Sequence, residues 1–325
     1  MNVAWIKGRA ADAIDVAMDL AVVPGFSAIG FNVRRRLFSW QPAWLEGRSV
    51  MVTGANSGLG EAAALDLVRC GAEVHMVCRN REKGERARDS IAASTGVEPT
   101  LHICDLSDLD SIREFTTAFL ESEEDLDVLI NNAGVMTPER EQTPAGFDRV
   151  FATNVLGPFL LTELLLPRIS ESDDGRVITM SSGGMYSTGF DLDDPQFQKP
   201  DYKPTAAYAH TKRAEVMLTE EWNDRSGDDG PVFYSVHPGW AVTPGMSAAL
   251  PGFHKVLGPI LRNSHEGAET AVWLCGAAPE DAPGGEFFED RKPRPKHRLP
   301  GTGDTAEDRR RLHELCAELA GVAAG

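Results

Sequence analysis

Thr53-Gly54-Ala55-Asn56-Ser57-Gly58-Leu59-Gly60 is the stretch that decides the fold of this chain. It follows an apolar run, 49–53, that is typical of a buried strand, and it precedes a run, 59–70, with the apolar spacing of a helix. Glycines at such a junction let the chain turn tightly, and they let backbone N–H groups approach a diphosphate at the positive end of the helix. The stretch therefore predicts a dinucleotide site between a first strand and a first helix.

Short apolar runs and longer amphipathic segments continue to alternate along the chain. Strands that alternate with helices form βαβ units, so we expect an α/β, doubly wound Rossmann fold. Its sheet should be mostly parallel, with about seven strands and helices on both faces. The expected strands are 49–53, 74–78, 101–104, 128–130, 176–180 and 232–236, and the expected helices are 59–70, 81–93, 112–120, 147–169 with a kink at 157–158, 208–222 and 305–320.

The expected domain organisation has three parts. They are an N-terminal extension over 1–46, a single Rossmann domain over 47–300 with a substrate lid at about 240–265, and a C-terminal helix within 301–325. The extension holds a mostly apolar stretch, 21–31, which Pro24 and Gly25 interrupt and which is too short to span a membrane. We expect it to be an arm that packs on the core or on a partner subunit. The alternative is an interfacial segment that touches a membrane surface through residues 1–45.

The net charge and the cysteines indicate which partners the protein is expected to bind and in which cellular compartment it is expected to work. The net charge is −17, and a protein this acidic would repel phosphates, so we expect no nucleic-acid partner. The five cysteines form no Cys-x-x-Cys motif, which is typical of reduced thiols in a cytoplasmic protein. The eight histidines are scattered along the chain, and we expect no metal site. Residues 290–298 form a basic segment, expected to be a solvated loop or, alternatively, a contact with a subunit or an anionic ligand.

Polar residues at the ends of later strands extend the predicted cofactor site. Arg79 follows the second strand, where an acid would hold a ribose diol and an Arg would receive a 2′-phosphate, so we expect NADP(H) rather than NAD(H). The alternative is a solvated Arg at a helix entry. Asp105 follows the third strand and is expected either to accept from the adenine amino group or to stand at a helix start. Asn131-Asn132-Ala133-Gly134 closes the fourth strand beside the same crevice.

Tyr208 and Lys212 place a phenol and an ammonium one helical turn apart. A close cation lowers the pKa of a phenol from its ordinary value near ~10, as proton exchange with a carbonyl near neutral pH requires. The pair is weak evidence alone, and it gains weight from the predicted cofactor site.

As a set, these motifs resemble the short-chain dehydrogenase/reductase family. Thr53–Gly60, Asn131–Gly134, Ser181-Ser182, Tyr208-x-x-x-Lys212 and Pro238-Gly239 stand in that family's order and approximate spacing over roughly residues 47–290. Further segments are similar to its retinol-dehydrogenase-like branch, and to a subgroup of that branch that also has an N-terminal extension. They are 101–108, 176–185, 237–245, 251–254 and 287–293.

The resemblance implies a catalytic tetrad. Tyr208 would be the general acid in carbonyl reduction and the base in alcohol oxidation, while Lys212 would lower its pKa and hold the nicotinamide ribose. Ser182 would hydrogen-bond the substrate oxygen, with Ser181 as the alternative. Asn154 would kink its helix and hold a water that relays the proton past Lys212.

The resemblance also implies contacts to the nicotinamide. Pro238-Gly239 would abut it, and Thr243 would hydrogen-bond its carboxamide or the diphosphate. The complete expected cofactor site is Thr53, Gly54, Asn56, Ser57, Gly58, Leu59, Gly60, Arg79, Asp105, Leu106, Asn132, Ala133, Gly134, Tyr208, Lys212, Pro238, Gly239 and Thr243.

The expected function is that of an NADP(H)-dependent oxidoreductase that interconverts a carbonyl and an alcohol by hydride transfer. The segment after Pro238-Gly239 is strongly apolar and closes over the substrate in this family, which favours a small hydrophobic substrate. The alternative is a catalytically weak NADP(H)-binding regulatory or scaffold protein with the same fold. The resemblance implies a homo-oligomer, and we expect a cytoplasmic location, with association at a membrane surface as the alternative.

Overall fold

One mixed sheet forms the centre of the molecule in the computed structural model. The structure describes residues 3–199, 201–242 and 257–323, and it describes no side chains for residues 3–9. The strand order is β3-β2-β1-β4-β5-β6-β7-β8, and all neighbours are parallel except β7 and β8. The strands are β1 (Ser49–Thr53), β2 (Glu73–Cys78), β3 (Thr100–Ile103), β4 (Val128–Asn131), β5 (Arg176–Met180), β6 (Val232–Val236), β7 (Phe287–Glu289) and β8 (Lys292–Arg294).

This sheet confirms the predicted doubly wound Rossmann fold. The chain order reverses between β1 and β4, and doubly wound sheets bind ligands in the crevice at such a point. The sheet has eight strands where about seven were expected. The additional strand is β8, which forms a short hairpin with β7 inside the segment predicted to be a loop.

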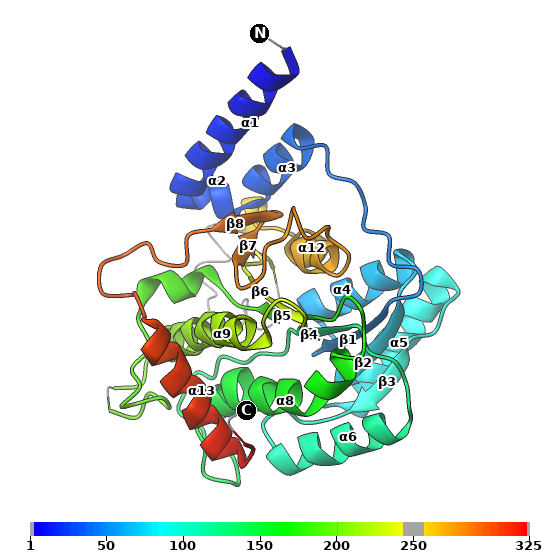
Figure 1. The fold of residues 1–325 in the computed structure, drawn as a ribbon, viewed down its shortest axis with the longest axis vertical. Helices are drawn as coiled ribbons and strands as arrows, with labels where there is room; N and C mark the ends of the chain where they lie inside the picture. Colours follow the sequence, from blue (N-terminus) through cyan, green and yellow to red (C-terminus); the bar gives the residue numbers. More distant parts are fainter. Residues whose placement is uncertain (1–2, 200, 243–256, 324–325) are drawn as a thin grey trace.

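Helices cover both faces of the sheet (Figure 1). The α4, α5 and α12 helices pack on one face, and α6, α8 and α9 pack on the other, with α13 against α8 and α9. Val50 and Val52 face the first layer, and Met51 faces the second, as the alternation of a strand requires. The helices are α4 (Gly58–Arg69), α5 (Arg81–Thr95), α6 (Leu109–Glu121), α7 (Arg149–Phe151), α8 (Gly157–Ile169), α9 (Pro204–Ser226), α12 (Ser264–Leu274) and α13 (Ala306–Ala320), with short 3₁₀ turns η2 (Gly183–Ser187) and η3 (Gly258–Ile260).

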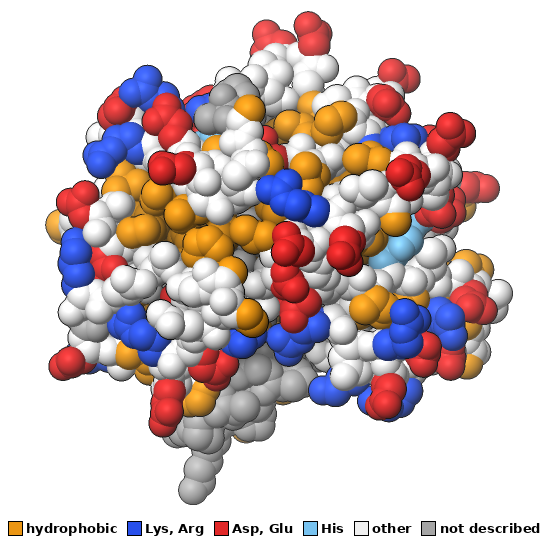
Figure 2. All heavy atoms as spheres, turned by 90° about the horizontal axis from the view of Figure 1, so that it is seen from below, with side chains coloured by type: hydrophobic (Ala, Val, Ile, Leu, Met, Phe, Trp, Pro, Cys, Tyr) orange, Lys and Arg blue, Asp and Glu red, His pale blue; other side chains and the backbone are white. Residues whose placement is uncertain are grey.

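The surface below α8 and α13 mixes charge and apolar area. Figure 2 shows acidic and basic side chains around a central apolar area on this face. Partly buried apolar residues of this layer include Leu164 and Leu166 on α8 and Leu319 on α13.

The predicted helix over 147–169 is divided in three. A π-helical turn, η1 (Ala152–Leu156), separates α7 from α8, so the irregularity lies just before the predicted kink at 157–158. Single π turns inside helices often mark functional positions, and Asn154 lies in this one. Within the described residues, Arg149–Ile169 alone is long and apolar enough to cross a membrane. Its most apolar window is 78% buried inside the protein, which is typical of a core helix.

The N-terminal extension folds into three helices that lie above β7, β8 and α12 (Figure 1). These are α1 (Val3–Leu20), α2 (Val22–Phe26) and α3 (Ala28–Leu37). Arg34 on α3 is fully buried and donates to Asp15 on α1 at 2.7 Å and to Asp290 at 2.6 Å. Arg262 donates to the same Asp290 at 2.6 Å. Charges buried in this way must be paired, so the extension is joined to the Rossmann domain by a buried ionic cluster.

The prediction that residues 290–298 form a solvated loop is wrong. Arg294 is buried and donates to both oxygens of Asp15, at 2.8 and 2.9 Å. Arg298 donates to Asp19 on the same helix at 2.6 Å. Arg294 and Arg298 of this segment therefore have their counter-charges within the chain, in the acids of α1.

Candidate active site

The Gly-rich turn lies between β1 and α4, as predicted. Gly54 and Gly58 have positive φ values of 67° and 59°, a conformation that favours glycine. A Cβ at Gly60 would overlap the carbonyl of Gly54 and the side chain of Asn132. The start of α4 is thus bare backbone, which suits a diphosphate at the positive end of a helix.

The ends of β1 and β4 are joined beneath this turn. Thr53 is fully buried, and its hydroxyl accepts from the N–H groups of Asn132 and Ala133, both at 3.0 Å. Asn132 Nδ2 donates to the carbonyl of Thr53 at 2.8 Å. The roles of Thr53 and Asn132 in the structure are therefore to fix the crevice between the two strands.

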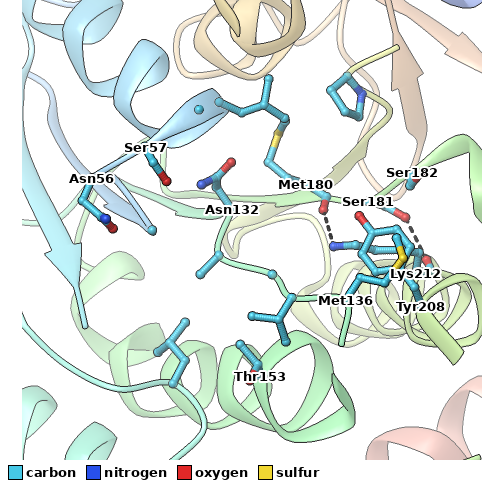
Figure 3. A pocket seen from close by; sticks show the side chains of 18 of the residues that line it. Asn56, Ser57, Asn132, Met136, Thr153, Met180, Ser181, Ser182, Tyr208 and Lys212 are labelled. Atoms are coloured by element: carbon cyan, nitrogen blue, oxygen red, sulfur yellow. Dashed lines mark hydrogen bonds between the residues drawn. The ribbon is translucent and has the colours of Figure 1, made fainter. Parts of the chain in front are cut away.

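A cavity of about 610 Å³ opens above the carboxyl ends of the strands. Asn56 and Ser57 lie at one end, and Ser181, Ser182, Tyr208 and Lys212 lie at the other (Figure 3). Of the predicted residues, the cavity is lined by Gly54, Asn56, Ser57, Gly58, Leu59, Arg79, Asp105, Leu106, Asn132, Ala133, Gly134, Ser182, Tyr208, Lys212, Pro238 and Gly239. Thr53, Gly60 and Asn154 lie outside the lining, and Thr243 and most of the expected lid at 240–265 lie outside the described residues.

The end of the cavity that lies far from Ser182, Tyr208 and Lys212 is positively charged. Arg79 is exposed at the end of β2, and within the described part of the chain it has no ion pair. Lys83, one turn into α5, lines the same end and was not predicted from the sequence. Asp105 Oδ1 accepts from the backbone and hydroxyl of Ser107 at 2.9 and 2.8 Å. Asp108, rather than Asp105, caps α6.

The two candidate serines have different environments. Ser181 is buried, and its hydroxyl donates to the carbonyl of Lys212 at 2.8 Å. Ser182 is half-buried, and its Oγ accepts from the N–H of Gly184 at 3.2 Å. Because an oxygen that only accepts retains its own proton, Ser182 can donate to a substrate oxygen in the cavity. This geometry favours Ser182 over Ser181.

Lys212 lies beside Tyr208, with its Nζ 5.3 Å from the centroid of the phenol ring. The ammonium donates to the carbonyl of Met180 at 2.9 Å and to Glu215 Oε1 at 2.6 Å. Both Lys212 and Glu215 are buried. An ammonium has three protons, so one remains for a third acceptor such as a ribose hydroxyl. Glu215 was not among the site residues predicted from the sequence, although it stands three residues after Lys212 on the same helix face.

Burial and the mutual interactions of Tyr208, Lys212 and Glu215 shift the pKa values of all three side chains. Burial raises the pKa of Glu215 from an ordinary value of 4.5 to about 7, although Lys212 opposes the shift. Burial lowers the pKa of Lys212, but the charge and hydrogen bond of Glu215, together with Tyr208, outweigh burial, so the net direction is up. Burial raises the pKa of Tyr208, Lys212 lowers it and Glu215 raises it, and the net direction is up from 10. Lys212 thus acts as predicted, but burial and Glu215 outweigh it.

Asn154 is fully buried in the π turn η1. Its Nδ2 donates to the carbonyl of Val135 and to Thr211 Oγ1, both at 3.0 Å, and its Oδ1 accepts from the N–H of Val135 at 2.8 Å. The predicted helix distortion at this residue is present. Both amide protons are already donated within the protein, so a water held by this side chain could only donate to Oδ1.

The N-terminal extension reaches the loop that carries Ser182. Phe26 on α2 contacts His237 edge-to-face, with ring centroids 4.4 Å apart. His237 Nδ1 accepts from the N–H of Gly183 at 2.9 Å, and a Cβ at Gly183 would lie 2.7 Å from His237 Nε2 and 3.0 Å from Phe26. The carbonyl of Phe26 accepts from the N–H of Trp240 at 2.7 Å. The extension thus supports both Ser182 and the start of the expected lid.

A dinucleotide crevice above a doubly wound sheet, with a Ser, a Tyr and a Lys at one end, defines a class of oxidoreductase. The family model described as short chain dehydrogenase matches residues 48–251, more than half of the chain. The chain belongs to the short-chain dehydrogenase family, whose NAD(P)(H)-binding Rossmann fold it has.

Relatives place the chain in the retinol-dehydrogenase-like branch of this family. It is 43% identical over 277 residues to dehydrogenase/reductase SDR family member 12 of Bos taurus, with 84% of this chain and 86% of that protein covered. It is 38% identical over 281 residues to retinol dehydrogenase 12 of Bos taurus, with 86% and 88% covered. The resemblance stated from the motifs is confirmed.

Solved structures show the same fold. A protein of Mycobacterium paratuberculosis matches with a TM-score of 0.70 and 29% identity, covering 88% of this chain and 97% of that chain. A short chain dehydrogenase of Shigella flexneri, complexed with NADP, matches with a TM-score of 0.62 and 25% identity, covering 77% and 100%.

Proposed function

We propose that the chain is an NADP(H)-dependent oxidoreductase that interconverts a hydrophobic carbonyl compound and its alcohol. The observation that carries the proposal is the convergence of Ser182, Tyr208 and Lys212 at one end of a cavity whose other end is the Gly-rich turn. A dinucleotide bound along this cavity supplies or accepts the hydride. The bare backbone of the turn and the free cations at the far end fit such a ligand.

The protein residues then handle the substrate oxygen and its proton. Ser182 donates a hydrogen bond to that oxygen and stabilises the charge that develops there. Tyr208 donates its proton in reduction and accepts one in oxidation. Lys212 stabilises the phenolate form, and its third proton would be available to hold the ribose of a bound cofactor. Asn154 holds the π turn against Val135 and Thr211, next to the lysine.

Apolar residues in the lining of the cavity support a hydrophobic substrate. They include Val135, Met136, Trp240 and Ala241. A screen of retinoid, steroid and aliphatic carbonyls with NADPH tests the proposal. Turnover of lipophilic carbonyls is expected. If no carbonyl or alcohol in the screen is turned over, the scaffold alternative is favoured.

Arg79→Ala is expected to weaken NADPH binding and to leave NADH binding nearly unchanged. A charge-assisted hydrogen bond to a phosphate contributes about 1.5–3 kcal/mol, or roughly 10- to 100-fold in Kd. Fluorescence titration with both cofactors measures the effect. Arg81→Ala, at the next exposed arginine, is the matched control, because Arg81 does not line the cavity. Equal affinity of the wild-type protein for NADPH and NADH would contradict the assignment of NADP(H).

Glu215→Gln is expected to shift the pH profile of alcohol oxidation to lower pH. The oxidation rate rises as Tyr208 loses its proton, and the Glu215 carboxylate raises the pKa of Tyr208, so its removal lowers that pKa. The profile of kcat against pH, with saturating substrates, measures the shift. Glu221→Gln is the control, since Glu221 pairs with Arg225 further along α9. A profile that does not move would show that Glu215 does not influence Tyr208.

We also propose that the three helices over residues 3–37 contact a membrane surface while they pack on the domain. The α1 helix has inverted polarity: Asp15 and Asp19 face the protein, whereas Val16 and Leu20 are 57% and 75% exposed. Eight of the ten large apolar residues that are exposed among the described side chains precede residue 47, namely Ile14, Val16, Leu20, Val22, Val23, Ile29, Leu37 and Trp44. The exposed Arg35 and Arg36 would meet anionic headgroups.

Flotation with liposomes that contain anionic lipids tests this contact. The wild-type protein is expected to float with them, and a Val16→Glu/Leu20→Glu variant is expected to stay in solution, because charge replaces apolar side chains that face the lipid. Val97→Glu, at an exposed valine distant from the extension in sequence, should float like the wild type. A wild-type protein that stays in solution would contradict the proposal.

A further inference from the structure

Two histidines that are 27 residues apart in the sequence meet on one face of the sheet. In the parallel pairing of β2 and β3, His75 lies opposite Thr100 and Val77 lies opposite His102. The two histidines are therefore diagonal neighbours on the same face. His75 Nδ1 lies 3.1 Å from His102 Nε2. It also lies 3.3 Å from Oε2 of Glu124, which follows the end of α6.

Hydrogen bonds among His75 Nδ1, His102 Nε2 and Glu124 Oε2 cannot give all three atoms a partner. A neutral imidazole has one N–H donor and one acceptor nitrogen, and a carboxylate only accepts. If His102 donates to His75 Nδ1, no proton lies between His75 and Glu124. If His75 Nδ1 donates to Glu124 instead, its lone pair is no longer available to His102. Glu124 Oε2 is in fact buried without a hydrogen-bond partner in the described structure.

We propose that His75, His102 and Glu124 form a Zn²⁺ site. A tetrahedral ion with bonds of about 2.0–2.1 Å separates its ligand atoms by about 3.3–3.4 Å, close to the two distances observed from His75. The three donor atoms all lie within 4.8 Å of one another. Two imidazoles and one carboxylate are donors that Zn²⁺ prefers, and they leave the fourth position to water.

Aromatic neighbours pack against the two histidine rings, and burial favours the neutral form that can bind a metal. The ring of Phe119 meets His75 edge-to-face, with centroids 5.3 Å apart, and Phe115 lies 5.3 Å from His102. Burial and the neighbouring His75 together lower the pKa of His102 to about 4. The ring is therefore neutral at physiological pH and has a lone pair for a metal. Glu124 lies in the acidic sequence 121–125, which favours a cation.

The role of such an ion would be structural. β3 is an edge strand of the sheet, paired with β2 on one side, and its residues are incompletely buried. The ion would join β3 to β2 and to the loop between α6 and β4. Arg79 follows β2 directly and Asp105 lies two residues after β3, so the same ion would steady the end of the cavity that would take the adenosine half of the cofactor.

Zinc titration of the chelator-treated full-length protein tests the site. Calorimetry with ZnCl₂ is expected to give one Zn²⁺ per chain, with a rise in melting temperature, and CoCl₂ is expected to give the visible bands of tetrahedral Co²⁺. His102→Asn and Glu124→Gln should each raise the Kd for Zn²⁺ by at least about tenfold, because loss of even an outer-shell partner costs 10–100-fold. Glu124 is 41% exposed, so Glu124→Gln should fold even if His102→Asn does not.

His265→Asn is the matched control. His265 is exposed and lies 2.7 Å from Asp66, so it represents an ordinary histidine–carboxylate pair at the surface. This variant should bind Zn²⁺ as the wild type does. The proposal is overturned if the wild-type protein does not bind Zn²⁺. It is also overturned if Glu124→Gln binds Zn²⁺ as tightly as the wild type, or if only His265→Asn loses affinity.

Discussion

Tyr208→Phe is expected to lower kcat by about 10²–10⁴-fold, the usual contribution of a general acid or base. The variant keeps the ring against Lys212 and removes only the hydroxyl that exchanges a proton with the substrate. NADPH affinity should change little, because Lys212 and the Gly-rich turn remain. The measurement is steady-state kinetics with the best substrate of the carbonyl screen, together with fluorescence titration of NADPH.

Tyr202→Phe provides the control for that experiment. Tyr202 lies just before α9, and its hydroxyl is hydrogen-bonded to Thr137 at 2.7 Å, outside the cavity lining. This variant should keep kcat near the wild-type value. If Tyr208→Phe retains the wild-type rate, Tyr208 is not the acid and base. The scaffold hypothesis would then explain the residues at the end of the cavity better.

Arg34→Met is expected to lower the free energy of unfolding by about 3–5 kcal/mol, because it removes one positive charge from a buried ionic cluster and leaves Arg262 and Arg294 to balance its acids. Arg34 is fully buried between Asp15 and Asp290. Urea denaturation, monitored by circular dichroism, measures the change. The effect should be seen in the whole domain, since Asp290 belongs to the β7–β8 hairpin and not to the extension.

Two further variants make this test specific. Arg88→Met removes a half-buried arginine that pairs with the exposed Asp89 on the same helix, and it should unfold like the wild type. Arg34→Met combined with Asp15→Asn should lose less than the sum of the two single changes, because the partners share one cluster. An unaltered midpoint for Arg34→Met would show that the cluster does not join the extension to the domain.

The fold and the cofactor crevice could be predicted because their signals are local. A strand, a Gly-rich turn and a helix occur within residues 49–70, and the βαβ alternation repeats the pattern. Tyr208 and Lys212 are neighbours on one helix, so their proximity also follows from spacing alone. Each of these predictions depends on geometry within a single element or between consecutive elements.

The missed features depend on contacts between distant segments. Phe26 and Trp240 are more than two hundred positions apart, and no periodicity in the sequence relates them. The meeting of His75 and His102 depends on the register of two parallel strands, which a long helical connection sets. Glu215 did have a local signal in its spacing from Lys212. Its burial, which shifts its pKa, could be known only once α9 had been placed on the sheet.

The ionic cluster between α1, α3 and the β7–β8 hairpin also has a consequence for the order of events during synthesis. Arg34 is translated 256 residues before Asp290, and Asp15 is translated 279 residues before Arg294. While the residues between them are made, α1 and α3 have no hairpin to dock on, and their apolar face is available to chaperones or to lipid. These helices are therefore made well before they can reach their final place.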